Sequence, residues 1–446
     1  QAYDKALVTL EACKDFNARL KERTLTELPG IGKGISELLY EWAKTGGAVA
    51  RDELVKALPE GLTDLIKIPG LGPKKARLII DELAIHTLGE LEYAIQENRL
   101  LHLKGFGEKV QAKILEGIEF LKSTQGQILI SSALPIAQEI ERAFVAELKK
   151  KKITGEVFRS GELRRHLEVL SSLDFVVRAP GLSSSAKKDL ESTLFKLAAK
   201  LLSENHVSIE VGLKIADAEN FGLFWLEATG SLPHFEFVQS ELKKKGLQKN
   251  SFESEEAVYQ NLGLKFVAPE LRESGDEFRI EVQQKLEELP VDQSVLGVFH
   301  NHTQYSDGLA TAEDMVDRAI ELGYRYIGFS DHSQSAFYAR GLKTEDLKRQ
   351  RKEIDALQKQ KPSIKIFWGI ESDILQDGSL DYDAAVLSQF DFVIASIHSR
   401  FQMDKKAMTE RVLKAIRNPH TRFLGHSTGR LLLGRKPFEM DMEKII

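Results

Sequence analysis

The stretch VFHNHTQYSDG, residues 298–308, places two histidines and an aspartate close together. His300 and His302 alternate along a predicted strand, so both side chains should point to one face of it. Asp307 follows in the predicted loop. Imidazole nitrogens and carboxylate oxygens are common donors to transition metals in proteins, so this stretch predicts a metal site.

Four more potential ligands occur where later apolar runs end. They are His332 in FSDHS, Glu371 in GIESD, His398 in ASIHS and His426 in LGHSTGR. In βα architectures the carboxyl ends of the strands form the active face, so all of these side chains should meet there. A lone histidine is more often a satisfied core residue, but a whole set at strand ends favours metal binding.

So many ligands indicate more than one ion. Mixed imidazole and carboxylate donors suit Mn, Zn or Fe better than Mg, which remains a further candidate. Paired metals about 3.5–4 Å apart support in-line displacement at phosphorus. Glu371 is the candidate central ligand, because a carboxylate can bridge two metals and a neutral imidazole cannot. Arg430, in the turn after His426, is a candidate phosphate clamp.

A glycine turn that occurs three times is the second motif. LPGIGKG (28–34), IPGLGPK (68–74) and LKGFGEK (103–109) each open a predicted helix. Two glycines in such a turn expose backbone N–H groups at a helix N-terminus, which suits a phosphate. One copy would indicate only a turn between helices, but three copies favour contact with a nucleic-acid backbone without base reading. The candidate DNA-binding residues are Gly30, Gly32, Lys33, Gly70, Gly72, Lys74, Gly105, Gly107 and Lys109.

The third stretch is SGELRRHLEVLSSLDFVV, residues 160–177. The pair Arg164 and Arg165 precedes an apolar run with a single acid, Asp174. Arginines followed by an acid on a strand are typical of a nucleotide-handling site, but such a site holds its metals with several carboxylates. Ser172 occupies the neighbouring position on the same strand face.

The pattern of elements suggests how these residues are positioned. Residues 1–125 have helical periodicity, and residues 126–215 mix strands such as SLDFVVRAP with long helices. Residues 216–285 are mixed, and from 290 to 446 apolar strands alternate with amphipathic helices. This alternation is typical of a parallel sheet or barrel. We therefore expect a multidomain α+β and α/β protein.

Bulk composition limits the function classes. The net charge of −5 gives no overall basic field, so DNA contacts must come from local geometry. The single cysteine, Cys13, allows no internal disulfide and fits a reducing cytoplasm. There is no run of 18 apolar residues to span a membrane and no signal peptide at the N-terminus, which begins with Gln1 and reads as a charged amphipathic helix.

Together these pieces resemble the bacterial family X DNA polymerases that carry a C-terminal PHP (polymerase and histidinol phosphatase) domain. The resemblance covers essentially the whole chain, including the turn Thr229–Gly230–Ser231 and the stretch NLGLKFVAPELRES. It implies a helix-hairpin-helix region with lyase-like and fingers parts (1–125), a polymerase palm (126–233), a thumb (234–285) and a PHP barrel (290–446). The family pattern continues through an Asp-Ala-His motif, and this chain stops before it, at MEKII. The barrel is therefore expected to be incomplete.

The resemblance also implies three ion-binding sets. They are His300 and His302 with Glu371 and a missing Asp; Asp307 and His332 with a missing His; and Glu371 with His398 and His426. Only the last set is complete in this chain.

The resemblance to the polymerase site is partial. The family pattern is Gly-Ser-x-Arg-Arg, then Asp-x-Asp, then a third Asp on a later strand. Gly161 and the two arginines match it, but Glu162 replaces the serine.

The metal-binding acids of that pattern are mostly absent. Ser172 replaces the first Asp, and Gly212 in SIEVGLKI stands where the third belongs. Glu210, two residues earlier on the same strand face, is the nearest alternative acid. Some members also use a lysine after the first hairpin as a lyase nucleophile, and the aligned residue here is Leu38.

The predicted function is a DNA-binding, metal-dependent phosphoesterase in DNA repair, with polymerase activity lost. The expected reaction is 3′–5′ exonuclease action or 3′-end trimming on gapped, nicked or 3′-ended DNA by a monomer, with cleavage at abasic sites as an additional activity. Three alternatives remain open: a working gap-filling polymerase, a non-catalytic DNA-binding scaffold, and a small-molecule phosphatase of the histidinol-phosphate type.

Overall fold

The computed structural model describes residues 3, 6–7, 9–10, 13, 15–47, 49, 53, 58–291 and 294–446. The chain divides into two compact units. One comprises Gln1–Ala112, Val291–Arg430 and Lys436–Ile446, and the other comprises Lys113–Pro290 and Leu431–Arg435. The predicted N-terminal helix falls largely outside the described residues.

The N-terminal region is helical, as its periodicity predicts. Its α-helices are α2 (Phe16–Glu22), α3 (Lys33–Thr45), α5 (Leu62–Leu65), α6 (Pro73–Leu83), α7 (Leu88–Gln96) and α8 (Glu108–Ser123). A capping box at Thr87 begins α7, where the Thr87 hydroxyl accepts from the backbone N–H of Glu90. The glycine turns precede α3, α6 and α8.

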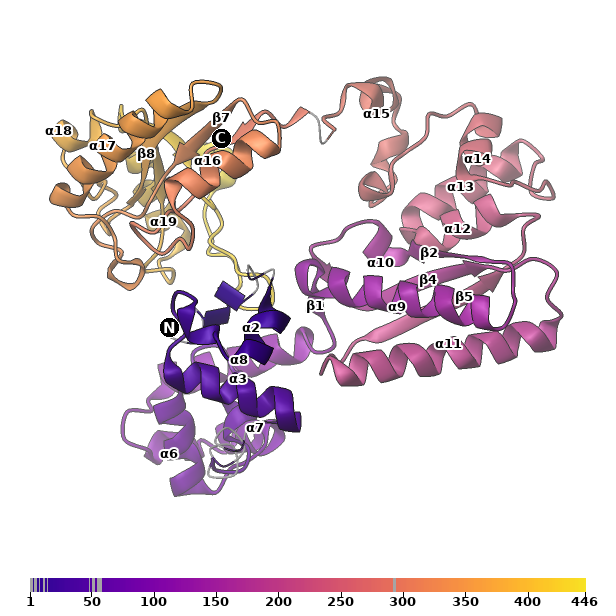
Figure 1. Cartoon of the computed structure of the whole chain (residues 1–446), viewed down its shortest axis with the longest axis horizontal. Coiled ribbons are helices and arrows are strands. Elements are labelled where there is room, and N and C mark those ends of the chain that lie inside the picture. The colour runs from indigo at the N-terminus through magenta and orange to yellow at the C-terminus, as the bar shows by residue number, and fades with distance from the viewer. Residues whose placement is uncertain are drawn as a thin grey trace. The chain divides into compact units, whose positions relative to one another are not determined.

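The second unit contains a three-stranded sheet in the order β2–β4–β5. Its elements are β1 (Ile128–Leu129), α9 (Ile130–Lys150), β2 (Glu156–Ser160), α10 (Gly161–Arg164), β3 (Val169–Leu170), β4 (Ser172–Arg178), α11 (Ser184–Glu204), β5 (Glu210–Ala216) and α12 (Phe221–Thr229). Strand β4 is antiparallel to β2 and parallel to β5. The long helices α9 and α11 run beside this sheet and bury one apolar stripe each into a common core (Figure 1).

A separate small core follows in the same unit. Helices α12, α13 (Leu232–Lys244) and α14 (Glu255–Leu262) contribute to it, together with Phe278, and α15 (Ile280–Lys285) follows in the chain. At its centre His234 is fully buried, with Nδ1 2.7 Å from Glu277 and Nε2 2.7 Å from the Tyr259 hydroxyl. Both ring nitrogens are thus satisfied by protein.

The C-terminal segment forms a five-stranded, wholly parallel sheet in the order β10–β9–β8–β7–β6. Its elements are β6 (Gly297–Val298), α16 (Ala312–Glu321), β7 (Tyr326–Phe329), α17 (Thr344–Gln360), β8 (Lys365–Asp373), α18 (Ala384–Leu387), β9 (Phe392–Ser396), α19 (Lys405–Ile416), β10 (Thr421–Leu424) and α20 (Met442–Ile445). Its helices surround the sheet in Figure 1. The central strands β8 and β9 are almost completely buried, as expected for a parallel sheet covered by helices.

Three boundaries differ from the sequence-based expectation. Strand β6 ends at Val298, so His300 and His302 lie beyond the strand and do not alternate along it, because the chain leaves the sheet to form the next loop. Glu371 lies within β8 and not past its end. The run PIAQEIERAFVAELKKKK predicts a helix from Pro135, but α9 begins at Ile130. Pro135 is therefore its sixth residue and lacks the N–H that would donate to the Ser131 carbonyl.

No helix in the described part of the chain is long and apolar enough to span a membrane.

Candidate functional site

Five histidines converge on the buried carboxylate of Glu371. Its Oε1 atom lies 3.0 Å from His300 Nε2, 3.2 Å from His398 Nε2 and 2.9 Å from His426 Nε2. Its Oε2 atom lies 3.0 Å from His332 Nδ1 and 3.5 Å from His302 Nε2. The side chain of Glu371 is only 1% exposed, so an unpaired charge there would be costly.

Asp307 lies on the other side of two of these rings. Its Oδ1 is 3.4 Å from His302 Nδ1 and its Oδ2 is 3.6 Å from His332 Nε2. All seven predicted ligands are therefore brought together. Three possible ion-binding groups result: His300–Glu371–His426, His302–Asp307–His332 and His332–Asp373–His398. These groups differ from the sets implied by the family resemblance in two respects. His302 is grouped with Asp307 and not with Glu371, and Asp373 is an additional member.

Unpaired lone pairs indicate that these residues fit metal ions. His302 Nδ1, His332 Nδ1 and Glu371 Oε2 are buried and make no hydrogen bond of acceptable geometry, although His332 Nδ1 and Glu371 Oε2 lie 3.0 Å apart. Buried polar atoms are nearly always paired, so orphans at one point need an explanation. Divalent cations would provide it, and the mixture of imidazole and carboxylate donors suits Mn or Zn.

The electrostatics of the cluster favour a charged carboxylate. Burial alone would raise the pKa of Glu371, but hydrogen bonds from His300, His398 and His426 outweigh it and hold this pKa far below its usual range. Burial lowers the pKa of His332, which favours the neutral, metal-binding form of the ring. For His398, burial is outweighed by Asp373 and Glu371, which raise its pKa to about 9, so cations binding here would displace a proton.

Asp373 is a functional residue that the sequence analysis missed. Its Oδ1 lies 2.6 Å from His398 Nδ1, which leaves Nε2 of that ring to face Glu371. A carboxylate behind a ligating imidazole fixes the ring and raises its basicity. The period of two along β8 puts Asp373 on the same face as Glu371, and this signal was available in GIESD.

Asp331 was also missed, and it organises the loop that carries Asp307. It is fully buried and accepts hydrogen bonds from the Thr303 backbone N–H (2.8 Å), the Ser306 hydroxyl (2.6 Å) and Gln350 Nε2 (2.5 Å). The residue directly precedes His332, so one carboxylate fixes the loops of two ligands.

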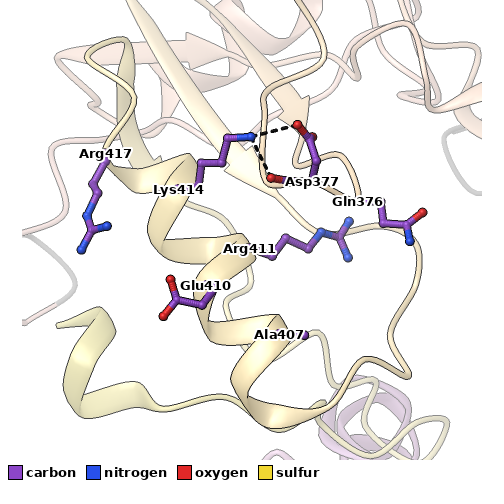
Figure 2. Close-up of a pocket in the computed structure, with 7 residues that line it drawn as sticks. All are labelled: Gln376, Asp377, Ala407, Glu410, Arg411, Lys414 and Arg417. Atoms are coloured by element: carbon purple, nitrogen blue, oxygen red, sulfur yellow. Dashed lines mark hydrogen bonds and ion pairs between the residues drawn. The ribbon is translucent and has the colours of Figure 1, made fainter.

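Arg411 on α19 supports the same face from behind. Its guanidinium donates to the backbone carbonyls of Ile374, Leu375 and Ser399, which follow Asp373 and His398. Figure 2 shows it beside a cavity of about 510 Å³, which is also lined by Gln376, Asp377, Ala407, Glu410, Lys414 and Arg417. None of these lining residues belongs to the ligand set.

Arg430, the predicted phosphate clamp, is exposed in the turn that begins at His426. Its role in catalysis stays a prediction.

The three glycine turns share one geometry. Gly30, Gly70 and Gly105 have φ values of 78°, 87° and 86°, which L-residues rarely adopt. The apolar residue between the glycines is buried in each turn: Ile31, Leu71 and Phe106 are 3%, 2% and 5% exposed. Each copy of the repeat therefore consists of a glycine in a left-handed conformation followed by a buried apolar side chain that anchors the turn.

The second glycine of each turn leaves open space. A Cβ atom built on Gly32, Gly72 or Gly107 would meet nothing within 4 Å. Gly32 and Gly72 are the N-caps of α3 and α6, and neither provides a side-chain cap, so the first N–H groups of α3 are left for another acceptor. Helix α6 begins at Pro73, which has no N–H, and the Lys75 N–H donates to the Gly72 carbonyl, so only the Lys74 N–H is left in its first turn. The lysines that follow, Lys33, Lys74 and Lys109, are exposed.

Asp174 is the one acid of the expected polymerase pattern that is in place, and it is crowded. Strands β4 and β5 pair Asp174 with Gly212 and Ser172 with Glu210, so these four residues lie on one face of the sheet. A Cβ atom on Gly212 would lie 1.9 Å from Asp174 Oδ1, and one on Gly161 would lie 2.1 Å from Oδ2. The carboxylate thus fills the space between two glycines. The Ser172 hydroxyl donates to the Asp174 carboxylate at 2.6 Å, and burial raises the pKa of Asp174.

The charged groups of the polymerase motif are engaged by other parts of the protein. Arg164 donates from two nitrogens to Glu255, at 2.7 Å each, and stacks on Trp225. Arg165 donates to Glu273 at 2.8 Å and to the carbonyl of Thr229.

Glu162 accepts from the backbone N–H and the hydroxyl of Ser171, at 2.6 and 2.8 Å. Thr229 is buried at the end of α12, and the next two residues form the turn into α13. There Gly230 has a φ of 71° and the Ser231 hydroxyl donates to the Glu273 carbonyl. Among the described residues, none of the possible ion-binding groups includes Asp174.

Leu38, at the aligned lyase position, lies on α3 and is half-buried. It offers no nucleophile.

Comparison with known proteins agrees with this architecture. Residues 299–431 match the PHP domain family, and residues 22–84 and 62–119 match the SAM-like helix-hairpin-helix tandem. The PHP match overlaps the Glu371 cluster, and PHP domains bind divalent metals, as these His, Asp and Glu groups are able to do. The helix-hairpin-helix matches contain all three glycine turns. The predicted fold class is thereby confirmed.

Three curated relatives are informative. The DNA polymerase/3′-5′ exonuclease PolX of Bacillus subtilis (strain 168) is 33% identical over 467 aligned residues, which cover all of this chain and 80% of that protein. A probable phosphatase of Caldicellulosiruptor saccharolyticus is 30% identical over 157 residues, 33% of this chain and 58% of that protein. A probable phosphatase of Aliivibrio fischeri (strain MJ11) is 34% identical over 86 residues, 19% of this chain and 32% of that protein. With helix-hairpin-helix turns at one end, a PHP metal face at the other and PolX-like sequence throughout, the chain belongs to the PolX family, the bacterial family X DNA polymerases with a C-terminal PHP domain.

Proposed function

We propose that the chain is a metal-dependent phosphoesterase that removes nucleotides from the 3′ end of DNA, and that its active face is the Glu371 cluster. The observation that carries this proposal is the convergence of five histidines on one buried carboxylate, with three buried donor atoms left unpaired. The name of the Bacillus subtilis relative, a DNA polymerase/3′-5′ exonuclease, supports the choice of substrate. Mn and Zn are the candidate ions.

The chain's own residues would divide the work. Glu371, His300, His302, Asp307, His332, His398 and His426 would hold the ions, with Asp373 keeping the His398 ring in its ligating orientation. Bound divalent ions neutralise phosphate charge and activate water. Arg430 would bind either the phosphate of the nucleotide that is released or the next phosphate in the strand.

DNA binding is proposed to come from the glycine turns and to be insensitive to sequence. Open space above Gly32, Gly72 and Gly107, with uncapped N–H groups in at least two of the turns, suits phosphate oxygens. The preferred substrates would be gapped, nicked or 3′-ended duplexes, in the context of repair.

Polymerase activity is proposed to be absent. Asp174 is the single remaining acid of the expected set, and both arginines of the motif are engaged by Glu255 and Glu273. Phosphoryl transfer of this type depends on metal positioning, which one crowded carboxylate does not provide. Incorporation of a nucleotide into a gapped duplex with Mn²⁺, lost in Asp174→Ala, would contradict this.

The main test is release of labelled 3′ nucleotides with Mn²⁺. Glu371→Ala should abolish release and disturb at least two of the ions, whereas His426→Ala should disturb one. Glu345→Ala, on the exposed start of α17, is the matched control and should behave as wild type. If Glu371→Ala hydrolyses DNA as the wild type does, the Glu371 cluster is not the active site and a DNA-binding scaffold is favoured.

A companion test concerns the glycine turns. Gly32→Val and Gly72→Val require no positive φ and meet no protein atom, so the fold should be retained while a phosphate is kept away. Both should weaken DNA binding equally for unrelated sequences. Unchanged affinity would leave the hairpins as structural turns.

A second candidate is hydrolysis of small phosphomonoesters, which the two probable phosphatases favour. Turnover of a nucleoside monophosphate faster than that of an oligonucleotide end would support it over exonuclease action.

A further inference from the structure

Two aromatic side chains stand exposed beside the metal ligands. They are Phe337 and Tyr338, which are 87% and 66% exposed on the single 3₁₀ turn η7 (Phe337–Ala339). Within residues 294–446, all of which the structure describes, the next most exposed aromatic ring is Phe423 at 40%. Large apolar rings held in water at a functional face are typical of ligand contacts.

The turn itself is firmly attached to the protein. The Ser335 backbone N–H donates to Asp381 Oδ2 at 2.7 Å, and Arg340 donates to the carbonyl of Ser306. Ala336 is fully buried. The rings are therefore exposed because the backbone directs them outward, and their positions are set before any ligand arrives.

The ridge formed by Phe337 and Tyr338 borders the ligand cluster directly. The ring of Tyr338 lies 5.8 Å from the ring of His332 and 6.3 Å from that of His398, edge-on to both. The contact of Arg340 with Ser306 ties the other end of the turn to the neighbour of Asp307. A phosphate bound at the cluster would therefore lie close enough to these two rings for the base of the same nucleotide to reach them.

We propose that Phe337 and Tyr338 form a stacking platform for the bases at an unpaired 3′ end, which holds the terminal phosphodiester against the Glu371 cluster. The inference rests on the proposed function and adds the form of DNA that the site accepts. Stacking on aromatic rings tolerates any base, since every base has a π face. A paired terminal base already stacks within its duplex, so the platform selects frayed, single-stranded or overhanging ends.

Binding can be tested without hydrolysis. The probe is an oligonucleotide with 2-aminopurine as its 3′-terminal base, added to the full chain with a chelator present. Stacking should quench the probe with the wild type, and Phe337→Ala/Tyr338→Ala should lose the quench. Tyr338→Phe should retain it, and so should Leu322→Ala, a control for loss of an exposed apolar side chain elsewhere on the segment. An equal quench in the wild type and the double variant, or no quench in either, would overturn the proposal.

Kinetics with Mn²⁺ provide the second readout. The double variant should raise KM for a 3′ overhang about 5- to 100-fold, the range expected for loss of base stacking. An end whose last residues are base-free tetrahydrofuran sugars should be cleaved equally by both proteins, and their Mn²⁺ affinities should match. If the double variant lost as much activity on base-free ends as on ends with bases, the turn would act only by supporting the metal cluster, and the platform proposal would be wrong. Absence of any 3′ release by the wild type would instead overturn the proposed function, and the fluorescence result would still decide whether the platform stacks bases.

Discussion

The palm face and the PHP face of this chain both carry the residue types of a phosphoryl-transfer site, but they differ in what those residues contact. In the palm, Asp174 sits between Gly161 and Gly212, and the arginine pair is engaged by glutamates of the same unit. In the PHP segment, buried nitrogens and a buried carboxylate oxygen converge without completing one another's hydrogen bonds. The difference suggests a criterion: polar groups that satisfy each other support structure, whereas converging groups left unsatisfied indicate a site that can bind an ion.

A third buried cluster supports this criterion. His234 is as deeply buried as any residue of the PHP face, but Glu277 and Tyr259 satisfy both of its nitrogens. Burial of a histidine is therefore not what marks a ligand.

Metal removal should separate the two faces most strongly. Stripping the chain with a chelator should reduce 3′ nucleotide release by more than about 100-fold, since loss of a mere supporting residue already costs about 10–100-fold. Restoring ions at one hundred times their Kd should stabilise the PHP segment by about 2.7 kcal/mol. Hydrogen exchange should register this in β7–β9 and leave β4 and β5 unchanged. Equal changes in both regions would mean that the palm also binds metal.

Asp373→Asn should have the next largest effect. Loss of the carboxylate behind His398 should weaken Mn²⁺ binding about 10–100-fold, because the ring loses its orientation and basicity. Asp377→Asn is the matched control: it lies on the loop after β8, is exposed, and pairs with Lys414 at 2.8 Å. Isothermal titration with Mn²⁺ measures both. If the two variants bind equally, Asp373 has no supporting role.

Acidification should destabilise the small core around His234 without any role for metals. Burial lowers the pKa of His234 to about 4, from 6.5 in the unfolded chain. Between these values the unfolded state binds the extra proton, so stability is full above pH 6.5 and falls as the pH drops toward 4. The loss at pH 5 should be about 2 kcal/mol, measured as a shift of the urea midpoint for that region. His234→Gln should flatten this dependence, and an unchanged pH profile in that variant would contradict the assignment.

The smallest effect is expected from restoring acids to the palm. Ser172→Asp combined with Gly212→Asp adds two carboxylates to Asp174 and Glu210 on one sheet face and should produce weak Mn²⁺ binding, measured in a Glu371→Gln background. Asp174 must rotate to admit the new side chain, which limits affinity. Primer extension should not return, because Arg164 and Arg165 stay paired. If primer extension returned, the absence of polymerase activity in the wild type would be due to the missing acids alone.

The sequence by itself determined the family, the helix-hairpin-helix turns and the presence of a metal-binding segment. These features depend on local chemistry: a left-handed turn requires glycine, and ions require particular donor atoms. The same reasoning located the polymerase motif and the positions of its acids, since β4 and β5 pair Asp174 with Gly212, the residue at the expected position of the third Asp.

Tertiary structure alone decided how these residues are used. The partner of Arg164, Glu255, lies 91 residues away in the chain, and the carboxylate that orders the Asp307 loop comes from Asp331, two residues after the end of β7. Whether His302 groups with Glu371 or with Asp307 depends on where the chain leaves a two-residue strand. Such pairings join residues that are far apart in the sequence and depend on the angles between side chains, and no spacing along the sequence encodes them. Only the folded chain therefore distinguishes a satisfied network from a set of donors that can hold ions.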